Sequence, residues 1–579
     1  MKLNQLYHLT NNSFLKNRIM TLETQIKHML NVNFGIKILA LPMVLFLIFS
    51  CVNKTQVDTI ITNAKVYTVN DSFDVVESVV VKNGIFYDMG SSKEMLSKYT
   101  STEIIDANGD FVYPGFNDGH SHFLAYGISE IKYANLMGTG SFNEVLDMVI
   151  EHYKKYPSEW ILGRGWDQND WDIKKFPDNS ALNKAFPETP VVLNRVDGHA
   201  LLANKAALEI AGITADTKIE GGEIVIVDNK PTGLLIDNAM DKLKSVIPTW
   251  TIEEKTTALL KAQDDCYAVG LTSVTDAGLD KSDILLIDEL HKKDDLNIRV
   301  YAMLSPNHDN FSYFIDKGPY HTDKLTVSSI KIYIDGALGS RGALLLEPYS
   351  DALHSHGSQV SSTKFLDSIC KMALENGFQV NTHAIGDSGN RIVLNTYANY
   401  LKGKNDLRWR IEHAQVVNPN DMHYFTDYSI IPSVQATHCT SDMYWADERL
   451  GEERVKHAYA YNDLMNTNNW IINGTDFPIE GISPIRTYYA SVTRKDVNDY
   501  PDGGFQMVNS LSKEDALKSI TIWPAMGSFE EETKGSIEPG KVADYVILDT
   551  DLLEVEQSDL LKARVLGTYV NGINVYESN

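Results

Sequence analysis

The sequence PGFNDGHSH, residues 114–122, ends an apolar run that begins at Phe111 and carries His120 and His122 two positions apart. In an extended segment, residues two apart point to the same side, so both imidazoles can bind one metal ion. A His-x-His pair by itself is a weak sign of a metal site. Whether this pair binds a metal depends on whether other parts of the chain place further ligands beside it.

The middle of the chain repeats one pattern, in which short apolar runs end in polar residues and are followed by helix-like stretches. This alternation is typical of parallel βα units. We count about eight runs, the number that a closed barrel needs, so the sequence predicts an α/β fold built on a (β/α)₈ TIM-type barrel. The runs are 111–116, 271–276, 298–304, 330–335, 378–383, 409–413, 430–435 and 470–475.

Two further regions surround this pattern. The interval from about 123 to 262 is far longer than an ordinary βα connection, which predicts a large insert after strand 1. Both ends of the mature chain alternate apolar and polar residues and contain Asn-Gly turn signals, at 83–84 and 571–572. They predict a small β-sandwich built from both termini. The expected domains are the sandwich over 52–110 and 535–579 and the barrel over 111–534.

The first 51 residues have a different character. Residues 38–50, ILALPMVLFLIFS, are almost wholly apolar, follow Lys37 and are too short to cross a bilayer comfortably as a helix. They predict a signal segment. The sequence that ends at Cys51 resembles a bacterial lipobox, although Phe49 is bulky for that motif. We expect an exported lipoprotein, anchored to the membrane at Cys51 and facing the periplasm or the exterior; simple export or an uncleaved anchor are the alternatives.

Composition excludes several classes of protein. The formal net charge of −25 argues against a nucleic-acid surface, which needs an excess of Lys and Arg to neutralise phosphates. The four cysteines form no CxxC pair, so neither a thiolate zinc site nor a dense disulfide framework is indicated. A soluble catalytic domain that acts on a small molecule fits these numbers better.

Polar residues also end three other predicted strands. His383 ends the fifth, Glu412-His413 the sixth, and Asp476 follows the eighth. Strand ends of a barrel converge on one face, so four imidazoles and a carboxylate can meet there around an ion. Such ligands suit Zn²⁺ or a similar divalent ion, and Asp476 could also take a proton from water that the ion activates.

Lys331 lies in the otherwise apolar run SIKIYIDG, residues 329–336. A snorkelling surface lysine is one interpretation. The other is a buried amine that reacts with CO₂ to give N6-carboxylysine, an anionic ligand that can bridge two ions. Desolvation favours the neutral amine and would help that reaction.

These motifs together resemble a known family. The His-x-His pair after PGFNDG, the lysine strand followed by DGALGSRGALL, and the elements THAIGD, RIEHAQ and NGTDFP are similar to the amidohydrolase superfamily, specifically its N-substituted formamide deformylase-like group. The similarity covers roughly residues 55–578. It implies a hydrolase that cleaves a non-peptide C–N bond, of an amide or an N-substituted formamide, with one or two divalent ions.

The resemblance also implies a role for each ligand. His120 and His122 would bind the more buried ion with Asp476, and His383 and His413 the second. Lys331 would bridge the two ions if it is carboxylated. Asp476 would serve as general base and then as general acid. The resemblance allows a homodimer, although no residue of the sequence shows it.

Residues that choose the substrate are expected in the insert and the loops. His199, in RVDGH, is the candidate for a catalytic carbonyl polariser, and Trp166, Asp197 and Arg341 are further candidates for substrate binding. The alternatives are a tryptophan packed beneath a lid and a structural ion pair for the arginine. For His438 a satisfied loop histidine is the favoured interpretation.

Other functions remain open at this stage. A cyclic amide, a deaminable ring or an ester could react on the same machinery, since fold does not settle reaction. A catalytically silent, lipid-anchored binding protein is expected to have lost Asp476 or one of the histidines. All of these residues are present.

Overall fold

A computed structural model describes residues 54–578. Eight parallel strands form a nearly closed barrel in the order β10-β17-β18-β20-β21-β22-β23-β24, and the short β19 (Tyr320–His321) pairs with β20 from outside. This confirms the predicted fold class. The strands are β10 Phe116–Ser121, β17 Leu271–Leu279, β18 Arg299–Leu304, β20 Leu325–Tyr333, β21 Gln379–Ala384, β22 Arg410–His413, β23 Ile431–Val434 and β24 Ile472–Asn473.

The barrel closes where the segment that follows β24 lies against β10, the first strand of the barrel. The backbone N–H of Asp476 donates to the carbonyl of His120 at 2.7 Å. A Cβ on Gly474 would lie only 2.4 Å from the backbone nitrogen of His120, so only glycine lets the two segments approach this closely. This contact places the residues after strand eight directly against the His-x-His segment.

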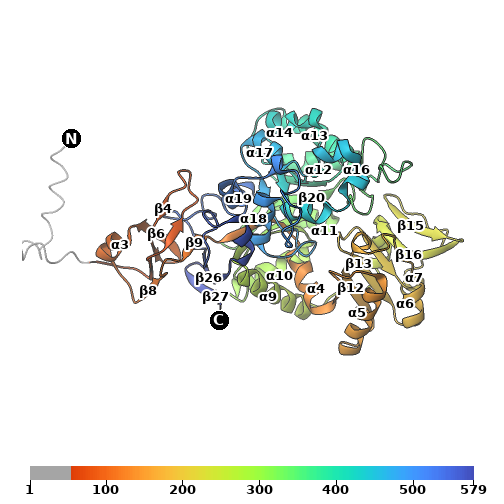
Figure 1. Cartoon of the computed structure of the whole chain (residues 1–579), viewed down its shortest axis with the longest axis horizontal. Coiled ribbons are helices and arrows are strands. Elements are labelled where there is room, and N and C mark those ends of the chain that lie inside the picture. The colour runs from red at the N-terminus through yellow and green to blue at the C-terminus, as the bar shows by residue number, and fades with distance from the viewer. Residues whose placement is uncertain (1–53, 579) are drawn as a thin grey trace, which may run out of the picture. The chain divides into compact units, whose positions relative to one another are not determined.

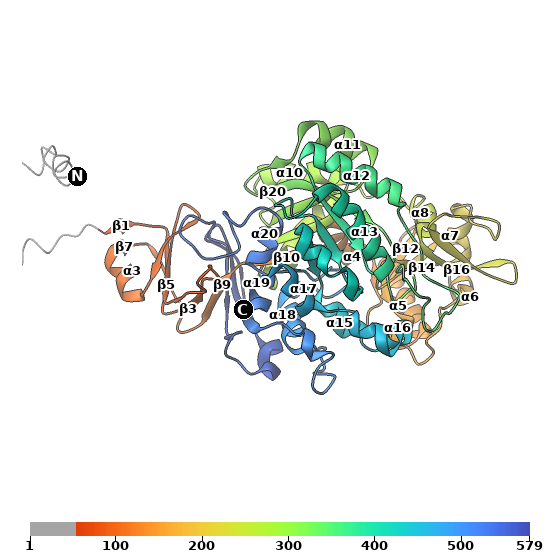
Figure 2. The same cartoon turned by 90° about the horizontal axis from the view of Figure 1, so that it is seen from above.

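Helices that follow the strands surround the barrel, as Figures 1 and 2 show. The longest, α9, begins with a capping box in which Thr251 and Glu254 satisfy each other's backbone N–H groups. The helices are α4 Phe123–Lys132, α9 Ile252–Ala268, α10 Lys281–Lys292, α11 His308–Phe314, α12 Thr363–Asn376, α13 Asp387–Leu401, α14 His423–Tyr428, α15 Ala436–Asp442, α16 Ala446–Arg454, α17 Tyr461–Asn468, α18 Pro484–Thr493, α19 Lys513–Ser519 and α20 Ile522–Gly527.

The first barrel strand differs from its prediction. The run 111–116 is divided: β9 (Phe111–Pro114) belongs to another sheet, and β10 begins only at Phe116. The division falls at Gly115, where a Cβ would lie 2.2 Å from Oγ1 of Thr272. The chain therefore crosses between two sheets at a point where hydrophobic pattern alone shows one continuous run.

The insert after the first strand contains a six-stranded sheet in the order β11-β12-β13-β14-β16-β15. Its inner strands alternate between two cores, with Leu193 and Leu202 on one face and Val192 and Leu201 on the other. The strands are β11 Ala134–Asn135, β12 Ile161–Trp166, β13 Val191–Arg195, β14 Ala200–Ala203, β15 Gly222–Val227 and β16 Lys230–Asp237, and the helices are α5 Phe142–Lys155, α6 Ser180–Ala185, α7 Lys205–Ile210 and α8 Asn238–Lys244.

The helices that flank the insert belong to the barrel. Helix α4 packs on α9 so closely that a Cβ on Gly127 would lie 2.1 Å from the carbonyl oxygen of Ala258. The interval 123–262 thus contains more than the inserted sheet. The chain leaves the barrel after α4 and returns to it at α9.

Strands from both ends of the chain form the sandwich, whose two sheets have the orders β6-β5-β2-β8 and β27-β26-β25-β9-β3-β4. Their shared core joins Ile61 and Val79 to Tyr545 and Tyr569. Figure 1 shows β26 and β27, in blue, in the region of the early strand β9. The strands are β2 Thr59–Thr62, β3 Lys65–Tyr67, β4 Val75–Val76, β5 Ser78–Lys82, β6 Ile85–Gly90, β8 Glu103–Asp106, β25 Tyr545–Leu548, β26 Val565–Val570 and β27 Ile573–Glu577.

Strand β1 (Thr55–Gln56) pairs in parallel with β7 (Tyr99–Thr100), which directly follows helix α3 (Ser92–Lys98) in the chain. Cys51 and the apolar segment before it lie outside the described residues. Over 54–578 no helix is long and apolar enough to cross a membrane. The three cysteines of this part, Cys266, Cys370 and Cys439, are buried and free.

Candidate metal centre and active site

The predicted ligands meet at the carboxyl ends of the barrel strands. His120 lies in β10, Lys331 in β20 and His383 in β21, while His413 ends β22. All are at least 95% buried, as is Asp476, and His122 keeps 25% of its side chain exposed. The structure therefore brings together all six residues that the sequence singled out as ligands, at the one end of the barrel where the fold predicts a site.

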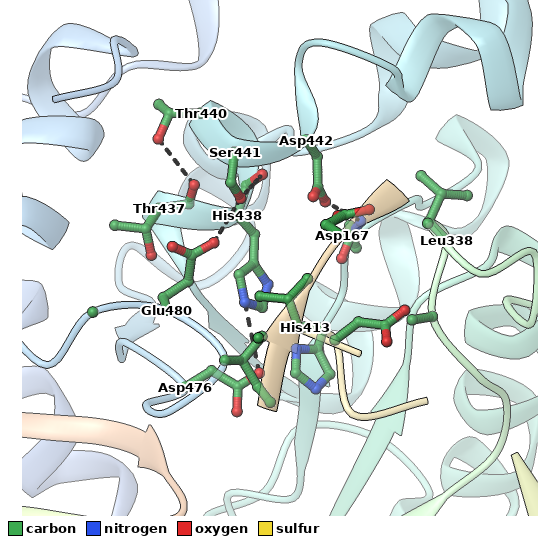
Figure 3. Close-up of a pocket in the computed structure, with 18 of the residues that line it drawn as sticks. Asp167, Leu338, His413, Thr437, His438, Thr440, Ser441, Asp442, Asp476 and Glu480 are labelled. Atoms are coloured by element: carbon green, nitrogen blue, oxygen red, sulfur yellow. Dashed lines mark hydrogen bonds and ion pairs between the residues drawn. The ribbon is translucent and has the colours of Figure 1, made fainter. Parts of the chain in front are cut away.

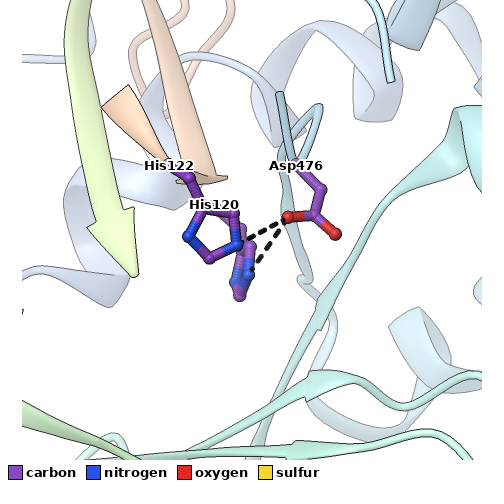
Figure 4. A group of neighbouring side chains, drawn as sticks. All are labelled: His120, His122 and Asp476. Carbon is purple, nitrogen blue, oxygen red and sulfur yellow. Dashed lines mark ion pairs between the residues drawn. The ribbon is translucent and has the colours of Figure 1, made fainter. Parts of the chain in front are cut away.

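One group of atoms suits a single ion. Nε2 of His122 lies 3.2 Å from Oδ1 of Asp476, and Nε2 of His120 lies 3.6 Å from the same oxygen, as Figure 4 shows. The three ligand atoms lie within 4.8 Å of one another. Oδ1 of Asp476 has no hydrogen-bond partner among the described residues. A carboxylate oxygen and two imidazole nitrogens thus point at one small volume.

The other two histidines lie beside this group. The rings of His383 and His413 have centroids 4.5 Å apart, and His413 lies 5.0 Å from His120. Nδ1 of His413 is 2.7 Å from Oε1 of Gln435, which leaves its Nε2 for another partner. Nε2 of His383 lies 3.6 Å from Asp335 and has no hydrogen-bond partner within residues 54–578.

His438 is a neighbour that the sequence interpretation undervalued. Its Nε2 lies 3.6 Å from Oδ2 of Asp476, and its ring is stacked parallel to His413 with centroids 5.9 Å apart. That nitrogen is buried without a hydrogen bond in the described part of the chain, so His438 is not a satisfied loop histidine. It forms a second group of potential ligands with His413 and Asp476.

Lys331 is buried within reach of the histidines. Its Nζ lies 3.3 Å from Nε2 of His120 and 4.8 Å from the ring centroid of Tyr333. No carboxylate of residues 54–578 lies within ion-pair distance of it. Burial lowers the pKa of Lys331 to about 8, so a substantial fraction of the amine is neutral near physiological pH.

A buried ion pair orients the central histidine. Nδ1 of His120 forms a short hydrogen bond with Glu412, and Nε of Arg410 donates to Oε1 of Glu412 at 2.7 Å. Arg410 and Glu412 are both fully buried. The contact fixes the ring so that Nε2 faces Asp476, which is the usual arrangement of a carboxylate behind a metal-binding histidine. The sequence analysis placed Glu412 at a strand end but gave neither it nor Arg410 a role, although both lie in the quoted RIEHAQ element.

A second carboxylate to which the sequence analysis gave no role, that of Asp118, hydrogen-bonds β10 to the segment that follows β24. Asp118 accepts hydrogen bonds from the backbone N–H of His120 at 3.1 Å and from the hydroxyl of Thr475 at 2.7 Å. Burial raises the pKa of Asp118 to about 7 despite these bonds. The contact holds the segment that carries His120 next to the segment that carries Asp476.

The protonation states of the histidines and of Asp476 suit a divalent ion. Burial lowers the pKa of His120 to about 4, and burial also holds the pKa values of His383 and His413 well below the ordinary value. Burial alone would raise the pKa of Asp476, but the neighbouring histidines hold it well below its usual range. Neutral imidazoles beside an ionised carboxylate, with unpartnered nitrogen and oxygen atoms, form a donor set that fits such an ion.

A cavity of about 380 Å³, which we call the ligand cavity, opens over this group. His199 from the insert lines it and lies with its ring 5.2 Å from that of His383. Nδ1 of His199 is 2.8 Å from Oδ1 of Asp237, so Nε2 is the nitrogen left for a ligand. Burial lowers the pKa of His199, but Asp237 and other carboxylates raise it above its ordinary value overall.

Asp197 also lines the ligand cavity. Its Oδ2 lies 2.7 Å from Arg195, and its Oδ1 accepts the backbone N–H of His199 at 3.0 Å. Asp197 thus shares the cation of Arg195 with Asp167, and its contact with His199 positions that loop.

Similarity to known proteins identifies the family of this chain. The model of a group described as the amidohydrolase family matches residues 103–576. The chain belongs to the amidohydrolase family. Among curated proteins, this amidohydrolase is 30% identical over 526 residues to putative amidohydrolase YtcJ of Bacillus subtilis, a match that covers 89% of this chain and 98% of the relative. It is 26% identical over 547 residues to N-substituted formamide deformylase of Arthrobacter pascens, covering 90% and 98%.

A solved structure agrees. An uncharacterized metal-dependent hydrolase from Pyrococcus horikoshii superposes with a TM-score of 0.70 at 29% identity, covering 86% of this chain and 99% of the other. The prediction of an enzyme that hydrolyses C–N bonds other than peptide bonds is thereby confirmed at the level of the family.

Two substrate-binding candidates do not reach the ligand cavity of this amidohydrolase. Trp166 is 1% exposed, packs on Trp171 with ring centroids 6.0 Å apart, and donates its Nε1–H to the carbonyl of Leu193 at 2.8 Å. It belongs to the core of the insert. Nη2 of Arg341 lies 2.7 Å from Asp351, which also pairs with Arg449, so its guanidinium is held in an ion-pair cluster. The structural alternatives are therefore the better interpretations of both residues.

Proposed function

We propose that this amidohydrolase cleaves an amide or N-substituted formamide bond, and that Asp476 carries the proton from the attacking water to the leaving nitrogen. The geometry of Asp476 supports the proposal. Its Oδ1 is unpartnered and faces His120 and His122, and its Oδ2 faces His438. Because its two oxygens face different histidines around the same cavity, one carboxylate could serve as general base first and as general acid afterwards.

The residues that would hold the ions follow from their positions. His120, His122 and Asp476 would hold the first, and His383 and His413 a second. A divalent ion, most reasonably Zn²⁺ with this many imidazoles, polarises the carbonyl and acidifies water when it is bound. Lys331 would bridge two ions after its neutral amine attacks CO₂, forms an N–C bond and releases one proton, which gives N6-carboxylysine.

His199 is the second group proposed to act on the substrate. Asp237 accepts the hydrogen bond from Nδ1, so the ring orientation is fixed and Nε2 is free to donate to the carbonyl oxygen of a substrate in the ligand cavity. A donor preorganised in this way stabilises the negative charge that develops on that oxygen. Asp476 would meanwhile hold the proton at Oδ1 until the C–N bond breaks.

Metal analysis tests the proposal together with hydrolysis. We expect protein from Val52 onward to hold one or two equivalents of a zinc-like metal and to release amine from N-substituted formamides or simple amides. His120→Asn should lose most of the metal and the turnover, because it removes a buried ligand. Elemental analysis and amine release measure both.

His308→Asn is the matched control. The side chain of His308 is 93% exposed, and His308 is not one of the candidate metal ligands. It should keep both metal and activity. A metal-free wild type after expression with ample metal, or His120→Asn with undiminished turnover, would contradict the proposal. Ammonia released from a ring amidine with no amide cleavage would instead identify a deaminase.

We also propose, from the sequence alone, that the protein is exported and anchored through a lipid on Cys51. Replacing Cys51 with alanine should move the protein from the membrane fraction to the soluble fraction, because a thioether-linked lipid would no longer form. Fractionation with mass spectrometry of the N-terminal peptide measures this. Equal distribution of wild type and variant, with no lipid mass on either, would exclude the anchor.

A further inference from the structure

A second cavity of about 490 Å³ lies next to the ligand cavity. His122, His199 and Tyr333 line both, so the candidate metal centre stands at the junction of the two. We call it the second cavity. A substrate that reaches the metal centre can therefore extend in two directions.

Two cations that line the second cavity lack a carboxylate partner among the described residues. Arg164 and Lys244 line it, and neither forms an ion pair within residues 54–578. Arg164 instead donates to the backbone carbonyls of Pro478 and Val196. Lys244 is exposed to the cavity. Two cations with no carboxylate partner are suited to an anion, because a charge-assisted hydrogen bond is stronger than a neutral one.

Most other charged side chains of the second cavity have a partner of opposite charge, as Asp197 has in Arg195. Lys255 pairs with Asp283 at 2.5 Å. Asp276 is the one carboxylate of this lining without a cation in the described part of the chain, and it accepts the backbone N–H of Leu124 at 3.1 Å. Two unpaired cations therefore stand against one unpaired carboxylate among the described residues of this lining.

The far wall of the ligand cavity carries carboxylates. Burial raises the pKa of Asp442 to about 7 and also raises the pKa of Glu480, so a cation bound there would stabilise their ionised forms. Asp442 accepts only from neutral donors, the hydroxyl of Tyr459 at 2.7 Å and the amide of Gln415 at 3.2 Å. Glu480 accepts the hydroxyl of Ser441 at 2.6 Å. Figure 3 shows Asp442 and Glu480 among the side chains that line this cavity. Neither carboxylate has a cation within ion-pair distance in the described part of the chain, and the same holds for Asp170 at the rim.

Two further observations support a ligand at this wall. Thr437 lines the same cavity, is only 7% exposed, and its Oγ1 has no hydrogen-bond partner among residues 54–578. Lys495 pairs with Asp499 at 2.9 Å, so its charge is directed to another carboxylate. Arg195 pairs with Asp167 and Asp197, so Arg486 and Lys331 are the cations of this lining left without an ion pair in the described chain, against the three carboxylates.

We propose that the two cavities sort the two halves of the substrate by charge: the nitrogen-bearing half lies in the ligand cavity, towards Asp442 and Glu480, and the acyl half lies in the second cavity, towards Arg164 and Lys244. This inference rests on the proposed function. Hydrolysis breaks the C–N bond and forms a C–O bond from water, and near pH 7 it gives a carboxylate and an ammonium ion. Each product would meet charges opposite to its own. The volume of the second cavity accommodates an acyl group larger than formyl.

Binding of the two product types to the metal-loaded protein tests the inference. Isothermal calorimetry with sodium acetate and with n-butylammonium chloride needs no turnover. Lys244→Met should weaken acetate binding about fivefold or more and leave butylammonium binding within about twofold, since it removes one charge contact. Asp442→Asn, which preserves shape, should weaken butylammonium about fivefold or more and spare acetate.

Matched controls lie close to each site. Lys242→Met changes another lysine of α8, and Asp447→Asn removes a nearby exposed carboxylate outside the ligand cavity. Neither should change either affinity. Equal shifts for both probes, or no shift, would overturn the inference even if the enzyme cleaves amides. The crossed pattern in a protein that cleaves no amide would support the charge sorting and refute the proposed reaction instead.

Discussion

Asp476→Asn is expected to lower kcat about 10²- to 10⁴-fold, because the amide can neither accept the proton of water nor return it to nitrogen. The residue is 4% exposed and faces His120 and His122, so no other carboxylate of the described residues can take its place there without moving. Asparagine keeps the size of the side chain. Steady-state rates and metal content should be measured on the same samples, with zinc resupplied in excess.

The control for this variant is Asp421→Asn. Asp421 is also a buried aspartate, 6% exposed, but its partner is Arg391 at 2.8 Å, outside the site. Its loss should change stability and leave kcat within about twofold, as expected for a change that spares the reacting groups. If Asp476→Asn with full metal turned over substrate at more than half the wild-type rate, Asp476 would not carry the proton.

The ligands could be predicted from sequence for a physical reason. His120, His383, His413 and Asp476 each follow or end an apolar run, and strand ends of a barrel converge wherever they lie in the chain. That rule needs only the order of elements. It does not need the register, and so the division of the run 111–116 at Gly115 did not disturb it.

The residues behind the ligands could not be predicted in the same way. Glu412 contacts His120 across 292 positions of sequence, and Asp237 reaches His199 from another strand of the insert. Such contacts depend on register and on rotamers, which hydrophobic pattern does not determine. The same limit explains Trp166, whose neighbours in sequence are polar although its ring faces a core.

The buried pair Arg410–Glu412 leads to the second prediction. Arg410→Met should destabilise the fold by about 3–5 kcal/mol, because it leaves the ionised Glu412 carboxylate buried beside the neutral ring of His120 without its cationic partner. Both side chains are fully buried, and Arg410 also donates to the carbonyl of Gly119 at 2.7 Å and to Ser433 at 3.0 Å. Denaturant unfolding of the metal-free protein measures the loss.

Glu412→Gln distinguishes the effect of this ion pair on metal affinity from its effect on the stability of the fold. The neutral amide still fills the space but no longer holds His120 by a charged hydrogen bond, so metal affinity should fall about 10- to 100-fold. The double variant Arg410→Met, Glu412→Gln leaves no unpaired charge. It should therefore recover part of the stability that Arg410→Met loses, while its metal affinity stays as low as that of Glu412→Gln. If the double variant were as unstable as the sum of the two single variants, Arg410 would stabilise the barrel through Gly119 and Ser433, and the charge of Glu412 would have little part in it.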